Sequence, residues 1–327
     1  MTVYIGIDVS KHKLDCAWLR DPETGKVKTR VFNNDAQGHT RLQDWLSQQT
    51  GVVLDELHVV MEATGVYHEA LAQALHQTGV CVSVMNPAQV RDFAKSLGMR
   101  GKNDKKDSVV LARYGEARRP RRWQPEPTAV RDLKALIARL EALDVDIQRE
   151  CNRREKAEIT QSDAVLDSID TILMALRSER KRLIQSIEDH IDGYPDLKKD
   201  RALLQSIPGI GPTVSLRLLA TLRSRSFTSA RQVAAFIGVI PIPWESGTSV
   251  RGQPHLSKAG SPKLRRLLYM AAVVSSKYNP DIARQYKRLT QRGKSPMSAL
   301  GAAMRKLVHI AYGVLKHQTP YRFQAVS

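Results

Sequence analysis

The chain has 327 residues, enough for two or more domains, and its 51 Lys and Arg residues against 33 Asp and Glu residues give a net charge of +18. The excess lies in the C-terminal part: residues 201–327 hold 20 basic residues and two acids, whereas residues 1–200 hold 31 of each. A segment this basic is typical of proteins that bind a polyanion, most simply nucleic acid. A membrane surface is the less favoured partner, because no basic amphipathic helix stands alone.

Three scattered cysteines, Cys16, Cys81 and Cys151, fit a reducing compartment and neither a disulfide framework nor a zinc site. No signal peptide precedes the first predicted strand, and the longest apolar run, Leu267–Val274, is too short to span a bilayer. The sequence therefore predicts a cytoplasmic protein.

Residues 1–117 alternate between predicted strands and helices. The predicted strands are Val3–Ile7, Leu14–Leu19, Val27–Phe32, Leu57–Met61 and Val80–Val84. The predicted helices lie near Gly38–Gln48, Tyr67–Thr78, Pro87–Leu97 and Lys105–Gly115. Three strands in a meander followed by helix–strand alternation predict an α/β domain of the RNase H-like type, in which the fourth strand lies beside the first.

Four acids follow these predicted elements in a pattern that suits a catalytic centre. Asp8 ends the first strand and Glu62 ends the fourth, so we expect them to be neighbours at one sheet edge. Asp104 and Asp107 lie three residues apart at a helix start and share one helix face near the positive end of the helix dipole. Taken alone, Asp8 or Asp104 has a capping role as its alternative.

Four carboxylates held together repel one another unless cations bind between them, and oxygen ligands suit divalent ions such as Mg²⁺ or Mn²⁺. Two such ions can clamp the attacking and leaving oxygens of a phosphodiester. The acids therefore predict metal-dependent chemistry on nucleic acid. Gly6, two residues before Asp8, marks a place where another group approaches the strand closely.

Arg118–Pro127 is a basic, proline-rich break that predicts a linker. Beyond it, apolar residues repeat at helical heptad spacing in two runs, Leu133–Ile147 and Val165–Ile187. The runs predict two long helices joined near Cys151–Ser162. Their function stays open between a coiled-coil hairpin that joins protomers and an intramolecular helical stalk.

The segment from Leu203, LLQSIPGIGPTVSLRLLATL, has the order of a helix-hairpin-helix motif. Gly209 and Gly211 free backbone N–H groups to meet a phosphate at the start of the following helix. Such a contact binds nucleic acid without reading its sequence. An ordinary corner between two helices is the alternative.

A polar segment, Pro241–Arg266, is predicted to be a loop rich in Gly, Ser and basic residues. It contains Ser246 beside Glu245 but no His triad to activate a serine, and the nearby His255 is interpreted as incidental. Composition alone therefore favours a phosphate-binding loop over a nucleophilic serine. The basic residues expected to bind nucleic acid here are Arg251, Lys258, Arg265 and Arg266.

Together these segments resemble the insertion sequence 110 family of bacterial DEDD transposases. The resemblance is carried, in chain order, by YIGIDVSKHKLD, MEATGVY, VMNPAQVRDFAKSLG with KNDKKDS, SIPGIG, ARQVAAFIGVIP, ESGTSVRG, LSKAG and LRRLLYMAA. These segments span nearly the whole chain. Where the family often has Lys-Thr-Asp-x-x-Asp-Ala, this chain has KNDKKDS, and both acids remain.

The resemblance implies an α/β plus all-α architecture. A RuvC-like, RNase H-like domain would occupy residues 1–120. A linker and coiled-coil helices would occupy residues 121–197. A mainly helical transposase domain with the helix-hairpin-helix motif would occupy residues 198–327. Family members act on DNA as multimers whose active sites combine the two domains, which implies a homodimer or tetramer at the bacterial nucleoid. A structured RNA from the element, called bridge or seeker RNA, guides them.

The resemblance also assigns roles to individual residues. It makes Asp8, Glu62, Asp104 and Asp107 the catalytic, metal-binding quartet. It makes Ser246 a nucleophile that attacks a DNA phosphate and forms a covalent phosphoserine link, which reverses the interpretation from composition alone. Trp244 has no role that the sequence explains.

Three functions compete on the sequence. The first is an RNA-guided, metal-dependent transposase that uses a serine nucleophile. The second is a RuvC-type nuclease that hydrolyses DNA without a covalent intermediate. The third is a non-enzymatic architectural protein, which the acidic quartet argues against because clustered carboxylates do not help to bind a polyanion.

Overall fold

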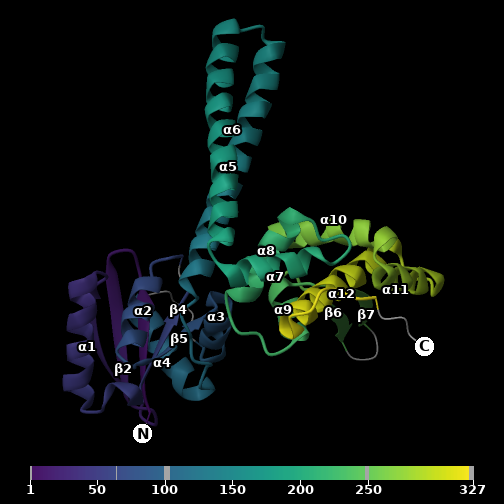
Figure 1. The fold of residues 1–327 in the computed structure, drawn as a ribbon. Helices are drawn as coiled ribbons and strands as arrows, with labels where there is room; N and C mark the ends of the chain where they lie inside the picture. The colour runs from purple at the N-terminus through teal and green to yellow at the C-terminus, as the bar shows by residue number, and fades with distance from the viewer. Residues whose placement is uncertain (1, 64, 99–103, 247–249, 324–327) are drawn as a thin grey trace. The chain divides into compact units, whose positions relative to one another are not determined.

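The computed structural model describes residues 2–63, 65–98, 104–246 and 250–323 (Figure 1). The chain divides into two units, Met1–Pro125 and Glu126–Ser327, here called the sheet unit and the helical unit. Each unit has its own apolar core.

A five-stranded sheet in the order β3-β2-β1-β4-β5 forms the centre of the sheet unit. Its strands are β1 (Val3–Val9), β2 (Lys13–Asp21), β3 (Lys26–Asn33), β4 (Leu57–Glu62) and β5 (Cys81–Met85). The pairs β1–β2 and β2–β3 are antiparallel, and the pairs β1–β4 and β4–β5 are parallel. The predicted meander, and the predicted place of the fourth strand beside the first, are confirmed.

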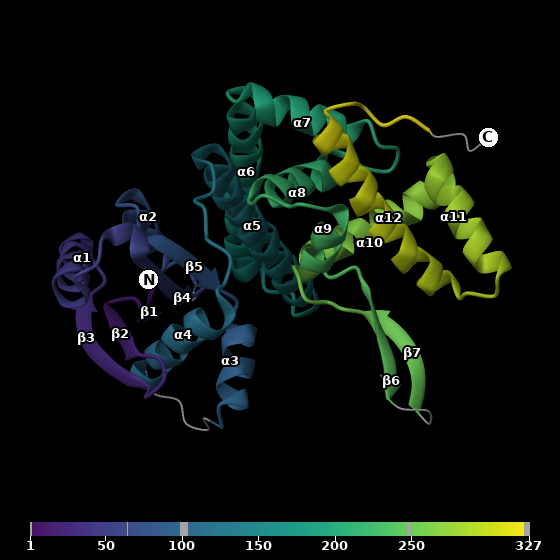
Figure 2. The same cartoon turned by 90° about the horizontal axis from the view of Figure 1, so that it is seen from below.

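Helices cover both faces of this sheet (Figure 2). They are α1 (Ala36–Thr50), α2 (Glu69–Gln77), α3 (Pro87–Ser96) and α4 (Asp104–Arg118), with a short 3₁₀ turn at Leu54–Glu56 before β4. On one face, side chains of α1 and α2 enclose the main core with Ile5, Ile7 and Met61. On the other face, α3 and α4 pack around Val60.

Gly6 lets α4 lie directly on β1. A Cβ atom at Gly6 would collide with the backbone oxygen of Ser108 and the backbone nitrogen of Ala112. Farther along α4, a Cβ atom at Gly115 would lie 2.8 Å from the Tyr4 ring. Because Tyr4 precedes Gly6 in the strand, α4 runs antiparallel to β1 and its first turn lies toward the C-terminal end of β1. The group predicted to approach Gly6 closely is therefore this helix.

The two edge strands of the sheet are protected in different ways. Along β3, exposed Lys26, Lys28 and Arg30 alternate with half-buried residues. Beside β5, the segment after α4 returns to the sheet, where the backbone N–H of Trp123 donates to the backbone oxygen of Val82 at 2.7 Å. Part of the predicted linker is thus bound to the sheet.

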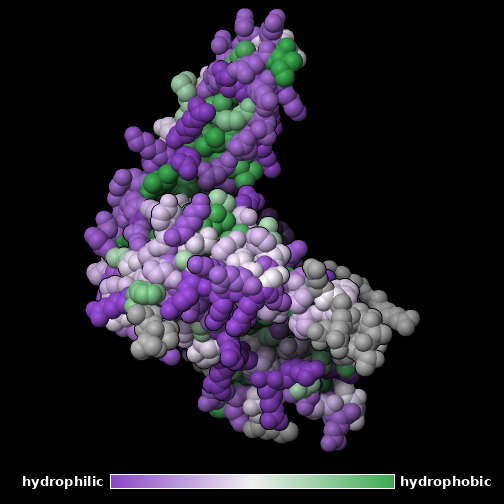
Figure 3. All heavy atoms as spheres, turned by 90° about the vertical axis from the view of Figure 1, so that its right-hand side faces the viewer, coloured by the Kyte–Doolittle hydropathy of each residue, from purple (hydrophilic) through white to green (hydrophobic). Residues whose placement is uncertain are grey.

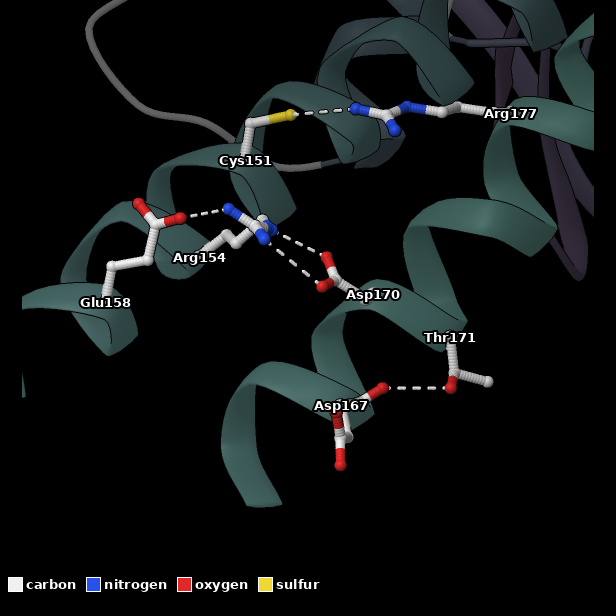
Figure 4. A network of polar contacts seen from close by, with 7 residues as sticks. All are labelled: Cys151, Arg154, Glu158, Asp167, Asp170, Thr171 and Arg177. Carbon is white, nitrogen blue, oxygen red and sulfur yellow. Dashed lines mark hydrogen bonds and ion pairs between the residues drawn. The ribbon is translucent and has the colours of Figure 1, made fainter. Parts of the chain in front are cut away.

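The helical unit begins with a long hairpin of α5 (Thr128–Ile159) and α6 (Asp163–Asp192). Figure 4 shows a polar network near its turn, in which Arg154 Nε donates to an Asp170 carboxylate oxygen at 2.6 Å. The same guanidinium pairs with Glu158 on its own helix. The turn falls within the predicted joint, and a role in joining protomers stays a prediction.

Six further helices complete the helical unit as described. They are α7 (Pro195–Gln205), α8 (Pro212–Arg223), α9 (Ala230–Ile237), α10 (Pro262–Tyr278), α11 (Pro280–Gln291) and α12 (Pro296–His317). They share one apolar core with the near ends of α5 and α6, which contribute Leu133 and Ile187. In the described ranges, no helix is both long enough and apolar enough to cross a membrane.

The segment predicted as a loop is instead largely an antiparallel ribbon of β6 (Pro241–Ser246) and β7 (Val250–Leu256), visible in Figures 1 and 2. The sequence prediction was wrong: it rested on the Gly, Ser and basic residues of this segment, which a two-stranded ribbon accommodates together with Pro243 and Pro254. In a ribbon of two strands each strand is an edge, where proline is tolerated.

Gly6→Ala tests the docking of α4. The added methyl group displaces the α4 backbone, so we expect the free energy of unfolding to fall by about 1–3 kcal/mol, the usual cost of overpacking. Denaturant unfolding of the full chain measures this change.

Gly313→Ala is the control, because a Cβ atom at Gly313 would have no neighbour within 4 Å. In a helix interior this change should stabilise the protein by about 0.5–1 kcal/mol. A Gly6→Ala protein as stable as the wild type would show that α4 does not pack on β1 as described.

Candidate functional site

Two acids lie side by side at the C-terminal ends of β1 and β4. Ile7 pairs with Met61 in the parallel register, so the next residues, Asp8 and Glu62, occupy neighbouring positions. Ile7 and Met61 face the main core, and strand alternation therefore places both acids on the opposite face, which α4 covers. Both acids are half-buried. The structure thus brings these two predicted residues together.

The first turn of α4 adds acids at the same edge. Asp104 is the first residue of α4, and half-buried Asp107 follows one turn later. The next residue, Ser108, is the one whose backbone lies against Gly6, just before Asp8 in β1. The helix therefore carries Asp107 toward Asp8, while the side chain of Asp104 lies outside the described part of the structure.

The donor set fits a divalent cation in kind, because carboxylate oxygens are the ligands that Mg²⁺ and Mn²⁺ prefer. Among the residues that the structure describes, no three His, Cys, Asp or Glu side chains are arranged to hold an ion. That search does not include the Asp104 carboxylate. The structure therefore describes the side chains of Asp8, Glu62 and Asp107 at this edge. Of Asp104 it describes only the backbone position, at the start of α4.

A fifth acid, Asp15, lies beside this edge, and the sequence analysis did not single it out. It stands directly opposite Asp8 in the β1–β2 ladder and is only 8% exposed. Residues directly opposite in a ladder lie on the same face. Lys13 Nζ lies 3.1 Å from a carboxylate oxygen of Asp15 and offsets its charge. Counting residues across the hairpin turn would have predicted this pair.

Asn34 joins the loops that follow the two strand-end acids. Its side-chain amide donates to the backbone oxygens of Ser10, at 2.9 Å, and Tyr67, at 3.1 Å. Its backbone N–H donates to the backbone oxygen of His12. Its side-chain oxygen accepts from His39 Nε2 at 2.9 Å. This Asn34 latch holds together the turn after β1 and the loop after β4.

The SIPGIG turn between α7 and α8 is packed on α10. The backbone oxygen of Pro208 accepts from buried Ser275 Oγ at 3.0 Å and from Asn279 Nδ2 at 3.3 Å. Gly209 has a φ of 98°, and a Cβ atom there would collide with Ser275 Oγ, so packing alone requires this glycine. Gly211 precedes α8 and has open space around it. A phosphate at this motif would therefore meet the Gly211 side.

The base of the ribbon interlocks with the end of α9. Gly238 ends α9 with a φ of 82°, and a Cβ atom there would lie 2.7 Å from the backbone nitrogen of Ala259. A Cβ atom at Gly260 would collide with the backbone oxygen of Phe236. Arg265 donates to the backbone oxygens of Gly260 and, in α9, Ile237. These contacts anchor the base of the ribbon, whose first strand, β6, ends at Ser246.

The structure describes the side chains of three of the four basic residues that were predicted to bind nucleic acid. Lys258 and Arg266 are exposed, whereas the guanidinium of Arg265 is used in the anchor just described. The side chains of Arg251 and Ser246 lie outside the described part of the structure. Figure 3 shows many hydrophilic residues, among paler and hydrophobic ones, on the face that it presents.

Acidification tests the Asn34 latch through His39, which is buried with 7% of its surface exposed. Burial lowers the pKa of the His39 imidazole, and the Asp35 carboxylate opposes that shift. Below about pH 6.5 the unfolded chain takes up a proton that folded His39 does not. The contribution of His39 to stability is therefore complete above that pH and is lost as the pH falls toward the folded pKa.

We expect His39→Gln to reduce the loss of thermal stability between about pH 7.5 and about pH 5.5, because glutamine does not titrate. Glutamine can still donate to Asn34. His12→Gln is the control, since that side chain is exposed. Equal pH dependence in wild type and His39→Gln would contradict the latch.

Two family models match the chain. The IS110 DEDD model, described as a transposase, matches residues 5–157. The model of the transposase IS116/IS110/IS902 family matches residues 201–287. The first match contains the acidic edge, and the second contains the SIPGIG turn and the ribbon.

Curated relatives match over most of the chain. The pilin gene-inverting protein of Moraxella bovis is 33% identical over 325 residues, which cover 97% of this chain and 97% of that protein. The transposase for insertion sequence element IS1111A of Coxiella burnetii is 26% identical over 296 residues, covering 82% of this chain and 76% of that protein. Among solved structures, T. thermophilus RuvC in complex with a Holliday junction substrate covers 38% of this chain and all of its own, with 15% identity and a TM-score of 0.27.

Proposed function

Because the chain belongs to the IS110 family of DEDD transposases, we propose that it cuts and rejoins DNA strands with an acidic metal centre and a serine nucleophile. The observation that carries the metal centre is the meeting of Asp8, Glu62 and the first turn of α4 at one edge of the sheet. The ligands would be Asp8, Glu62, Asp104 and Asp107, and Mg²⁺ or Mn²⁺ held there would stabilise charge on the reacting phosphate.

In the proposed reaction, Ser246 Oγ forms a bond to phosphorus as the phosphorus–oxygen bond to the neighbouring deoxyribose breaks. The serine proton leaves, and the departing deoxyribose oxygen becomes a hydroxyl group. The reverse attack by a strand hydroxyl on the phosphoserine rejoins DNA and restores the serine. Ser246 suits this role by position, because it ends β6 on an anchored ribbon.

A hydrolytic nuclease of RuvC type is the second candidate function. The Moraxella bovis relative is named for inverting a gene, and inversion requires that cut ends be joined again. A covalent phosphoserine conserves the phosphodiester bond for rejoining, whereas hydrolysis does not. The relative's name therefore supports the serine mechanism for this chain.

The acidic ligands are tested by Asp8→Asn and Asp107→Asn. Each change removes a carboxylate charge that the proposed metal ions need. Loss of a residue that only hydrogen-bonds to a metal ligand typically costs about 10–100-fold in activity. We expect loss of a ligand itself to reduce strand cleavage by more than this. Gel assays on labelled DNA, with Mg²⁺ and with EDTA, measure this, and filter binding shows whether DNA binding survives.

Asp92→Asn is the matched control, because Asp92 lies in the same unit and its side chain is 73% exposed beside Lys95. It should keep wild-type cleavage. Full activity of Asp8→Asn, or full activity in EDTA, would rule the metal role out.

The nucleophile is tested by Ser246→Ala. Without the hydroxyl group no phosphoserine can form, so we expect complete loss of the protein–DNA species that resists denaturation, and loss of recombined product. Ser257→Ala, in the segment just after the ribbon, should keep both. Peptide mapping of the trapped wild-type species should identify Ser246. Cleavage without any adduct in the wild type would favour the hydrolytic nuclease instead.

We also propose that an RNA of the element guides the protein to its DNA. The 20 basic residues against two acids in residues 201–327 support a large nucleic-acid surface. Each duplex phosphate neutralised adds about −0.9 to the slope of log affinity against log salt. A helix-hairpin-helix turn binds backbone rather than base edges, so sequence would be read by pairing.

This proposal predicts that protein expressed with the element's non-coding flanks carries a specific RNA, and that protein expressed without them does not recombine DNA. Sequencing of the bound RNA and a recombination assay measure both. Changing the guide segment should move the target. Sequence-specific recombination by RNA-free protein would contradict the proposal.

A further inference from the structure

Trp244 is an exposed aromatic residue on the ribbon, outside the core of the helical unit. Its surface is 59% exposed, although tryptophan is among the residues that folding usually covers. The other three tryptophans, Trp18, Trp45 and Trp123, all lie in the sheet unit. Trp244 is therefore the one tryptophan in residues 126–327, and it is placed at the surface of the most basic part of the sequence.

The ribbon holds the Trp244 indole in a defined place. Trp244 pairs with Gly252 across the ladder, and a Cβ atom at Gly252 would lie 2.6 Å from Trp244 Cδ1, so the ring lies over this glycine. The His255 ring lies 5.9 Å away, centroid to centroid. A ring fixed in this way loses little further freedom when a flat partner stacks on it.

A bulge creates the space for this ring. The ladder register shifts by one residue between Ile242 and Trp244. Without the shift, Trp244 would stand opposite Gln253 in place of a glycine. Bulges recur beside active sites, where they re-aim a side chain. Here the bulge places glycine opposite Trp244.

Trp244 is also close in the strand to the proposed nucleophile. Ser246 is the last residue of β6 and follows Trp244 by two positions. Two residues of a strand span about 6.8 Å. A distance of this size also separates a phosphate from the base of an adjoining nucleotide.

We propose that Trp244 stacks on a nucleobase beside the phosphate that Ser246 attacks, and so holds that nucleotide in place. The inference rests on the proposed function of Ser246. The surrounding positive charge selects a nucleic acid as the partner, and stacking accepts any base because every base has a flat aromatic face. Trp244 is thus a positioning residue for the reaction.

The binding test uses full-length protein with Ser246→Ala, so that binding is measured without reaction. A single-stranded oligonucleotide is added, and tryptophan emission and oligonucleotide anisotropy are recorded. We expect the emission of Trp244, obtained by difference from Ser246→Ala/Trp244→Phe, to be quenched as DNA binds. Trp244→Leu should weaken binding about tenfold, and Trp244→Phe less, because base stacking is lost or reduced.

In Trp244→Leu the new side chain still covers Gly252. The variant therefore removes base stacking and keeps the packing of the ribbon. Tyr194→Leu is the matched control, since Tyr194 is 41% exposed in the same unit but lies against His190. It should bind as the parent protein does. With Ser246 intact, Trp244→Leu should slow adduct formation at saturating DNA more than Tyr194→Leu does.

Unchanged Trp244 emission at saturating DNA, or equal affinity of the leucine variant, would overturn the inference. So would an emission change that depends on protein concentration without DNA, which would identify a second copy as the partner. An adduct that still forms in Ser246→Ala would instead refute the proposed nucleophile. The quenching experiment would still test the stacking of Trp244 in that case, because it measures binding and needs no reaction.

Discussion

The contact between α4 and β1 at Gly6 is the constraint on which the acidic edge depends. Any side chain at this position would lift the helix by the size of at least one methyl group, since helix backbone atoms fill the space. The helix start and the strand end would then separate, and their acids with them. Gly6, which has no side-chain functional group, therefore determines whether the acids of β1 and α4 can lie close together.

Bringing like charges to one edge has an electrostatic cost that neighbouring groups must offset. Two unit charges 4 Å apart repel by about 4 kcal/mol at an effective dielectric constant of 20. Lys13 offsets Asp15, opposite Asp8 in the ladder, and the positive start of α4 favours nearby carboxylates. Bound cations would lower this cost further, so ion binding and the stability of this edge should be coupled.

The sequence predicted the sheet and its strand-end acids because both follow from local patterns: buried strands that stop at Asp8 and Glu62, and a helix that starts with spaced acids. It did not predict the ribbon, where the Gly, Ser and basic residues were interpreted as a loop, or the Asn34 latch, which joins loops far apart in the chain. The sequence also predicted that Arg265 binds nucleic acid, and this stays a prediction; it did not predict that the guanidinium donates to backbone oxygens of α9 and Gly260. The latch and the Arg265 contacts are tertiary contacts, which residue patterns do not contain.

Both edge strands of the five-stranded sheet carry features that oppose pairing with another strand. A chain approaching β3 meets the charged row of Lys26, Lys28 and Arg30, which would lose hydration on pairing. A chain approaching β5 finds the Val82 oxygen already taken by Trp123. These features disfavour the addition of a strand from another copy at either edge, and with it the strand-by-strand growth of fibrous aggregates.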